Sequence, residues 1–250
     1  VSQMSNVYGR STEGRRRCLR FVVAASVVIT LPLLVIAFAP IGARLLSTVY
    51  GVGPDVAQHV TTYLKLLAPL TIIDAFRQYC VGLIVQARLT GWVTVLNLIH
   101  LTTFIGALLL GFSEGFAPVY VLTGAQALGA VVHLGLLIWV VRARYRPPTR
   151  QEHANVSRRE LIEFFMPVAT TGVMFAISRP VLYALVARTP DAIVSIAALR
   201  VGFDVATLFQ VTANQFRHFF VTFGDDALAE KRRFMVLIGL GITACMLLIA

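Results

Sequence analysis

Residues 161–223 read LIEFFMPVATTGVMFAISRPVLYALVARTPDAIVSIAALRVGFDVATLFQVTANQFRHFFVTF. This stretch is apolar and long enough to cross a bilayer twice, because about 20 helical residues cross a hydrocarbon layer of roughly 30 Å. It nevertheless carries charged side chains at Arg179, Arg200, Asp204 and Arg217. Charged groups at membrane depth are costly and most often mark a functional site. The stretch therefore predicts a membrane protein with a polar interior.

The composition of the whole chain supports this interpretation. Hydrophobic residues make up 57% of the 250 residues and charged residues only 14%, which is too little polar surface for a soluble globule. The formal charge of +10 would suit a nucleic-acid partner, but the arginines form short clusters between apolar runs. Such clusters are typical of cytoplasmic loops, so we expect a lipid bilayer as partner and no nucleic acid.

Several kinds of site are excluded by the absence of their motifs. The sequence has no nucleophile elbow, P-loop, HExxH motif or carboxylate cluster with metal-ligand spacing, and its three cysteines are widely separated. We therefore expect neither an enzyme nor an ATP-driven pump, and no cofactor or metal ion. The sequence begins without Met and stops inside an apolar run at Ala250, so we expect a fragment.

Hydropathy predicts six complete membrane spans and a last one that is cut short. Proline at positions 32 and 40 predicts kinks in the first span, and the Arg179–Pro180 pair predicts a break in the fifth. A basic loop is expected over residues 10–20. The complete spans are expected at about 21–43, 61–86, 92–112, 118–141, 161–188 and 192–223.

Basic residues concentrate in alternate loops. They lie at 10–20, 142–159 and 231–233, whereas the opposite loops hold only Arg44 and Arg188. Because positive loops stay in the cytoplasm, we expect a multi-pass protein of the cell inner (plasma) membrane with these three loops inside.

Two segments suggest an internal repeat. Residues 9–17 and 224–233 each have a glycine followed by basic residues just before an apolar run. Six spans separate them, so the halves would be parallel and related by an axis along the membrane normal. A chance match between two cytoplasmic loops is the alternative. We expect an N-terminal lobe over 1–141, a basic cytoplasmic linker over 142–160 and a C-terminal lobe over 161–250.

Basic residues outnumber acidic ones inside the predicted spans. If they line one cavity, its field favours an anion; if they reach the two membrane surfaces, it need not. Asp74 and Arg77 are three residues apart, so they share a helix face and can pair. The residues expected to bind or transport the substrate are Lys65, Asp74, Arg77, Asn97, His100, Arg179, Arg200, Asp204, Asn214 and His218.

Each of these residues has a structural alternative. Arg200 and Asp204, four apart, can form a structural pair, and Pro180 can produce a kink without binding anything. Single histidines on apolar helices, such as His100 and His133, are more often packing residues than proton carriers, although imidazole suits proton relay near neutrality.

Three segments resemble the progressive ankylosis (ANK) family, which belongs with the MATE-like transporters of the multidrug, oligosaccharide-lipid and polysaccharide exporter superfamily. They are the AISRPV motif at 176–181 followed by LVAR at 185–188, Asp74–Ala75 with Gly82, and LTGW at 89–92. The resemblance implies an all-α polytopic membrane helix bundle of MATE-like fold with two six-helix lobes. This chain would then cover the end of the second helix to part of the ninth.

The resemblance also implies a function. The resemblance implies an alternating-access secondary transporter that exports a small anion such as pyrophosphate, nucleotide or citrate. One alternative is a MATE-type antiporter of organic cations coupled to sodium ions or protons, with Asp74 or Asp204 as the ion site. Another is a lipid-linked saccharide flippase or a polytopic scaffold without transport. The expected partners are an anionic small molecule and a coupling ion.

Overall fold

The computed structural model describes residues 1–51, 53–146, 157–192, 194–207 and 228–249, and every regular element within these ranges is helical. Five of the described helices are long and apolar enough to cross a membrane. The predicted all-α membrane helix bundle is therefore confirmed. The long helices are α2 (Thr12–Phe38), α4 (Pro54–Gln86), α5 (Thr90–Ser113), α6 (Pro118–Arg144) and α7 (Arg158–Val186), and the others are α1 (Ser2–Tyr8), α3 (Pro40–Tyr50) and α9 (Leu228–Ile249).

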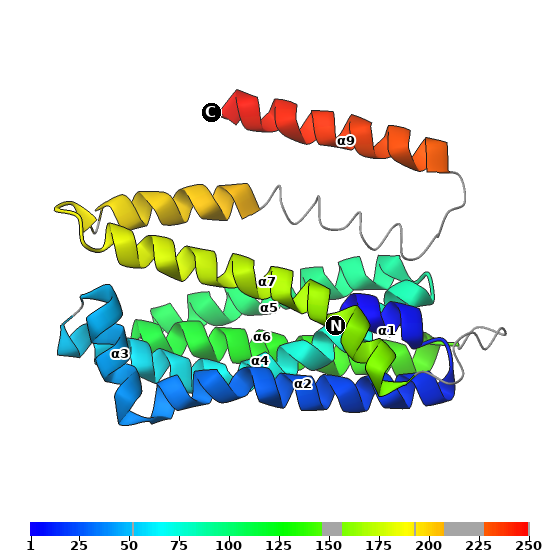
Figure 1. Cartoon of the computed structure of the whole chain (residues 1–250), viewed down its shortest axis with the longest axis horizontal. Coiled ribbons are helices and arrows are strands. Elements are labelled where there is room, and N and C mark those ends of the chain that lie inside the picture. Colours follow the sequence, from blue (N-terminus) through cyan, green and yellow to red (C-terminus); the bar gives the residue numbers. More distant parts are fainter. Residues whose placement is uncertain (52, 147–156, 193, 208–227, 250) are drawn as a thin grey trace. The chain divides into compact units, whose positions relative to one another are not determined.

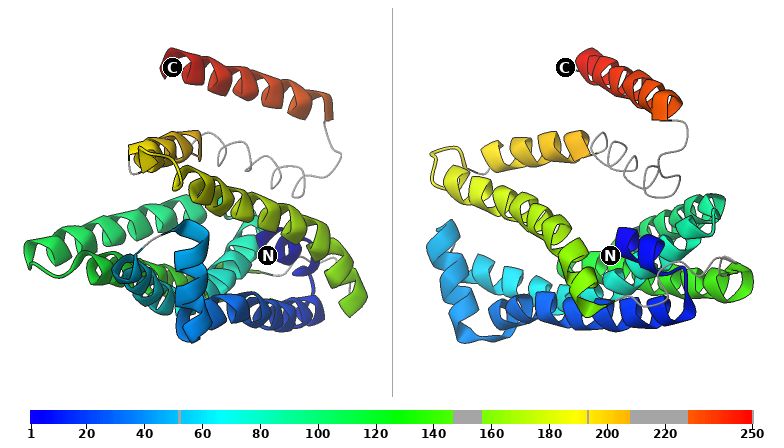
Figure 2. Two further views of the ribbon diagram at one scale, coloured as in Figure 1. Left: turned by 60° about the vertical axis from the view of Figure 1, so that its left-hand side comes forward. Right: turned by 45° about the vertical axis from the view of Figure 1, so that its right-hand side comes forward.

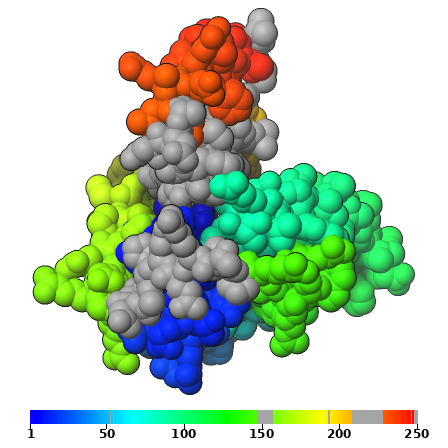
Figure 3. Space-filling model, turned by 90° about the vertical axis from the view of Figure 1, so that its right-hand side faces the viewer, coloured from blue at the N-terminus to red at the C-terminus, as the bar shows by residue number. Residues whose placement is uncertain are grey.

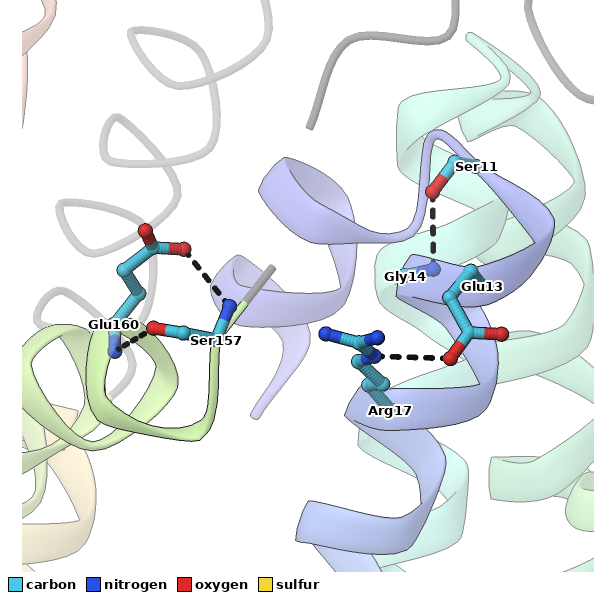
Figure 4. Close-up of polar contacts among 6 residues, drawn as sticks. All are labelled: Ser11, Glu13, Gly14, Arg17, Ser157 and Glu160. Carbon is cyan, nitrogen blue, oxygen red and sulfur yellow. Dashed lines mark hydrogen bonds and ion pairs between the residues drawn. The ribbon is translucent and has the colours of Figure 1, made fainter. Parts of the chain in front are cut away.

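The start of α2 corrects the predicted basic loop over residues 10–20. The Ser11 side chain accepts a hydrogen bond of 2.9 Å from the Gly14 backbone N–H and so caps the helix (Figure 4). One turn later Arg17 Nε donates to Glu13 Oε1 at 2.9 Å. Because the cap lies upstream of Arg15, Arg16, Arg17 and Arg20, these arginines occupy the first turns of α2, and Arg10 lies before the helix.

The end of α2 corrects the first predicted span, 21–43. Proline disfavours helical backbone in the preceding residue, and Ala39 is extended at φ −82°, ψ 144°. Pro40 therefore begins α3 and does not kink one long span. In α7 the predicted break at Arg179–Pro180 is wrong, since the helix continues to Val186.

The start of α7 is fixed by a capping box. Ser157 Oγ accepts from the Glu160 N–H, and the Glu160 carboxylate accepts from the Ser157 N–H, each at 3.1 Å (Figure 4). This reciprocal pair satisfies donors that the first helical turn leaves unpaired. The first helix after the basic linker therefore begins at a position that the sequence encodes.

The chain divides into two compact units, 1–188 and 189–250. In the first, α4 packs against α1, α2 and α6, and α5 packs on α6 (Figures 1 and 2). Helix α7 contacts α1, α2 and α3. The second unit contains helical residues 194–207 and α9. The lobes and linker expected from the sequence stay a prediction.

The packed core of the first unit lies at one end, which we call the basic end: the starts of α2, α5 and α7 and the ends of α4 and α6. In a view of this end, the first helices (blue) lie between the start of α7 (yellow-green) and α5 and α6 (green) (Figure 3). Elsewhere α5 and α7 expose large apolar side chains, as a lipid-facing surface does. The most deeply buried apolar residues of the core are Met4, Cys18, Val22, Leu83, Ile84, Leu96, Leu137, Val140 and Leu161.

Tyr145 joins three elements at the basic end. Its hydroxyl donates to the Gly9 carbonyl at 2.9 Å and lies 2.8 Å from the Gln86 amide oxygen. A hydroxyl has one proton, so turning the Gln86 amide to present its nitrogen lets it donate to Tyr145; this also gives Gln86 Nε2 a partner that it otherwise lacks. Burial raises the pKa of Tyr145, which keeps the hydroxyl protonated. The Arg15 guanidinium lies 5.2 Å from the centre of the ring.

We expect Tyr145→Phe to destabilise the protein by about 1–3 kcal/mol, because the Gly9 carbonyl and the Gln86 amide lose a buried partner. The measurement is the thermal unfolding midpoint of the detergent-purified intact protein. Tyr120→Phe is the matched control, since Tyr120 is 60% exposed near the start of α6. Equal unfolding midpoints for the two variants would contradict a stabilising role of the Tyr145 hydrogen bonds to Gly9 and Gln86.

Candidate functional site

Helices α4, α5 and α6 carry a group of polar side chains, which we call the Arg77–His133 cluster: Asp74, Arg77, His100, Gln126 and His133. Of these, His133 is buried, Arg77, His100 and Gln126 are partly buried, and Asp74 is exposed. Asp74 and Arg77 lie one turn apart on α4. Gln126 and His133 lie two turns apart on α6, so they share a face of that helix. Apolar helices thus hold five hydrogen-bonding side chains within the membrane-spanning part of the chain.

Arg77 is the centre of the cluster. Its Nη1 donates to Asp74 Oδ1 at 2.6 Å, and its Nε and Nη2 lie 3.1 Å and 2.8 Å from His133 Nδ1. The Asp74–Arg77 pair predicted from the spacing is therefore present. Because a guanidinium cannot accept a hydrogen bond, His133 Nδ1 must carry the lone pair and Nε2 the proton. His133 is thus a neutral partner of a charged group.

His100 reaches the cluster from α5. Its ring stacks on that of His133, with centroids 5.1 Å apart and planes 21° apart. Gly129, one turn before His133 on α6, makes room for this approach: a Cβ added there would lie 3.0 Å from Cε1 and Nδ1 of His100. The glycine therefore permits the close contact between the two histidine rings.

Three buried polar atoms of the cluster have no partner within the described part of the chain: His100 Nδ1, Gln126 Oε1 and His133 Nε2. His133 is only 2% exposed. Leaving such an atom unpaired costs about 1–3 kcal/mol, so buried polar atoms normally bond to protein, water or a ligand. Arg77 also has five N–H groups, of which three make the bonds described above. The cluster can therefore accept further hydrogen-bonding groups.

The other predicted residues of the first unit lie apart from these contacts. Lys65 is exposed on α4, with its Nζ 5.5 Å from the centre of the Phe38 ring. Asn97 is exposed on α5, and Arg179 is partly buried on α7. Of the predicted residues described in this unit, the structure brings together Asp74, Arg77 and His100.

In the second unit, Arg200 Nε and Asp204 Oδ2 are 3.9 Å apart, and their side chains are 74% and 67% exposed. Such an exposed pair contributes little to stability. The predicted residues Asn214 and His218 lie outside the described residues.

Gln126 and His133 were not among the predicted site residues, and the sequence favoured packing for His133. The available signal is their spacing on α6. Gln126, Gly129 and His133 follow each other at intervals of three and four, so a polar stripe with a glycine at its centre lies along an otherwise apolar helix.

No curated protein and no solved structure shows significant similarity to this chain. The family model described as progressive ankylosis protein (ANKH) matches residues 2–246. The match confirms the resemblance inferred from the sequence motifs, and this family of membrane proteins is associated with pyrophosphate and citrate transport. The chain therefore belongs to the progressive ankylosis protein family.

Proposed function

We propose that this chain forms part of an alternating-access secondary transporter that exports a small anion of the pyrophosphate, nucleotide or citrate type. The observation that carries the proposal is the Arg77 guanidinium. It lies on the apolar helix α4 and bonds one carboxylate, that of Asp74, and one neutral imidazole, that of His133. The pathway would be a polar cleft between the two lobes of a MATE-like fold. The bilayer and the anion are the partners that this mechanism requires.

The chemistry of Arg77 suits a phosphate or carboxylate substrate. A guanidinium is planar, stays charged, and presents N–H groups in a fork that matches two oxygen atoms of such an anion. Asp74, its charged partner, holds only Nη1, and the Asp74 side chain is 59% exposed. An anion can therefore replace the existing partners of Arg77 without leaving a fully buried charge unpaired.

Further cations would strengthen the field of the cleft. Lys65, Arg179 and Arg200 are further basic residues inside the predicted spans, and we assign them to attraction of the anion. Asn97, Asn214, His100 and His218 would add hydrogen bonds to its oxygen atoms. Asp204 would hold Arg200 when no anion is bound, as the ion pair between them suggests.

Charge reversal tests this proposal. The intact protein is reconstituted in liposomes, and uptake and efflux of labelled citrate, pyrophosphate and nucleotide are measured for Arg179→Glu and Arg200→Glu. We expect each to lower flux by about tenfold or more, since loss of a charge-assisted hydrogen bond costs about 1.5–3 kcal/mol. Arg44→Glu on the exposed side of α3 is the matched control. Unchanged flux of all three anions in both variants would rule out the cationic cleft.

The exposed Asp74 carboxylate favours one second candidate, a cation antiporter in which Asp74 binds the coupling ion. This candidate requires sodium-dependent efflux of a cationic dye that is lost in Asp74→Asn. Under the anion proposal, dye efflux is absent from the unmodified protein.

A further inference from the structure

The bond between Arg77 and His133 can form only while His133 lacks a proton on Nδ1. Both Nε and Nη2 of Arg77 point to that one lone pair, at 3.1 Å and 2.8 Å. A proton on Nδ1 would turn the acceptor into a donor facing other donors. Arg77 and a proton therefore compete for the same atom.

Within the part of the chain that the structure describes, the ionisable groups that face His133 come from α4 and α5. Helix α4 contributes Arg77 with Asp74 behind it, and α5 contributes His100, stacked at 5.1 Å between centroids. Helix α6 itself has no other ionisable side chain between Tyr120 and Arg142. The positive charge of Arg77 opposes a second positive charge on His133, and an anion paired with Arg77 would remove that opposition.

Resting on the proposed anion transport, we propose that His133 is the proton-binding site that couples the anion to a proton moving in the same direction. A proton from water binds the Nδ1 lone pair, and the two hydrogen bonds from Arg77 break. The freed guanidinium N–H groups, the new Nδ1–H and the buried Nε2–H then form a donor set for the anion. Since each ligand favours the other, binding of proton and anion is cooperative and reciprocal.

The unpartnered atoms support this site independently of the Arg77 bond. His133 is 2% exposed, yet its Nε2 donor has no partner within the described residues, and the same holds for His100 Nδ1 and Gln126 Oε1. A residue whose role is only to pack would leave such atoms at a cost of about 1–3 kcal/mol each. These atoms are therefore available to water or to a bound ligand, and the His133 Nε2–H can donate to an anion.

The test uses the intact protein in liposomes that enclose a pH-sensitive dye, with labelled citrate outside. Citrate entry and lumen acidification are followed from about pH 5.5 to 8, a range that spans histidine titration. The key variant is His133→Gln, whose amide oxygen can still accept from Arg77 but takes no proton in this range. His59→Gln, on the exposed start of α4, is the matched control. Citrate ionises identically in every sample, so differences between variants arise from the protein.

We expect citrate flux of the unmodified protein and of His59→Gln to rise as pH falls, by at most about tenfold per pH unit for one coupled proton. Lumen acidification should accompany citrate entry. His133→Gln removes two donors to the anion, so we expect a reduced but measurable citrate flux that has lost both the steep pH dependence and the coupled proton movement. His133→Asn is measured as well, in case the glutamine variant fails to reach the membrane.

Two results overturn the coupling while leaving anion transport intact: proton movement that persists in the His133 variants, or unmodified protein that carries citrate without protons. Loss of all flux in both His133 variants assigns the residue a structural role and also overturns it. Failure of the proposed function gives a different result, because the unmodified protein would then carry neither citrate nor pyrophosphate at any pH.

Discussion

Arg77→Met is expected to reduce citrate and pyrophosphate flux by at least about a hundredfold. Arg77 links two members of the cluster, since it bonds both Asp74 and His133. A hundredfold loss corresponds to about 2.7 kcal/mol of transition-state stabilisation, which is within the range of one or two charge-assisted hydrogen bonds. Flux in liposomes, normalised to the amount of inserted protein, is the measurement.

A structural role of the Asp74–Arg77 pair must be separated from a role in transport. Arg77→Met leaves the Asp74 carboxylate without its cation, and an unpaired charge at membrane depth costs about 2.5–3.5 kcal/mol on insertion scales. Adding Asp74→Asn removes that charge. The double variant should therefore recover insertion and thermal stability without recovering flux.

Arg44→Met on α3 is the matched control, and it should retain the flux of the unmodified protein. Arg77→Lys should lose about tenfold, because an ammonium keeps the charge but not the fork of N–H groups. If flux returns in the Arg77→Met, Asp74→Asn double variant, the Asp74–Arg77 pair has a structural role and no role in transport.

Local features of this fold were predictable because they depend on one helix at a time. Hydropathy located the apolar helices, and the interval of three between Asp74 and Arg77 predicted their contact. The first span was misplaced at both ends. Its beginning depends on the Ser11 cap upstream of the arginines, and its end on Pro40, which starts a new helix and does not bend the old one.

The remaining part of the site depends on how separate helices pack. His133 meets Arg77 only because α6 lies against α4 in one particular register, and His100 meets His133 only because Gly129 is small. Periodicity within one helix contains no information about either register. The sequence of α6 therefore favoured a packing role for His133 and predicted no role for Gln126.

Gly82→Ala is expected to destabilise the first unit by about 1–3 kcal/mol, the usual cost of overpacking, and Gly82→Val by more. Helix α1 packs against α4 at this glycine. A Cβ added to Gly82 would collide with Ser5 Oγ and the Ser2 carbonyl oxygen and lie 3.0 Å from the Ser2 carbonyl carbon. Backbone atoms cannot rotate away as a side-chain end can, so α1 must move.

Gly106→Ala in α5 is the matched control, because an added Cβ there meets nothing within 4 Å. Alanine favours a helix over glycine by roughly 0.5–1 kcal/mol, so this variant should be as stable as the unmodified protein or more so. The two glycine-to-alanine changes should therefore shift the unfolding midpoint in detergent in opposite directions. A Gly82→Ala midpoint equal to that of Gly106→Ala would contradict the packing.

The displacement of α1 should also reach Tyr145. Gly9 follows α1 directly, and its carbonyl accepts the hydrogen bond from the Tyr145 hydroxyl. If Gly82→Ala moves the Gly9 carbonyl away from Tyr145, their hydrogen bond is already weakened, and Tyr145→Phe then removes less stabilisation. The double variant should then be less destabilised than the sum of the single variants, by about 0.5 kcal/mol or more, as expected for residues that share a contact. If the two destabilisations are strictly additive, the packing of α1 on α4 and the Tyr145 hydrogen bond are energetically independent.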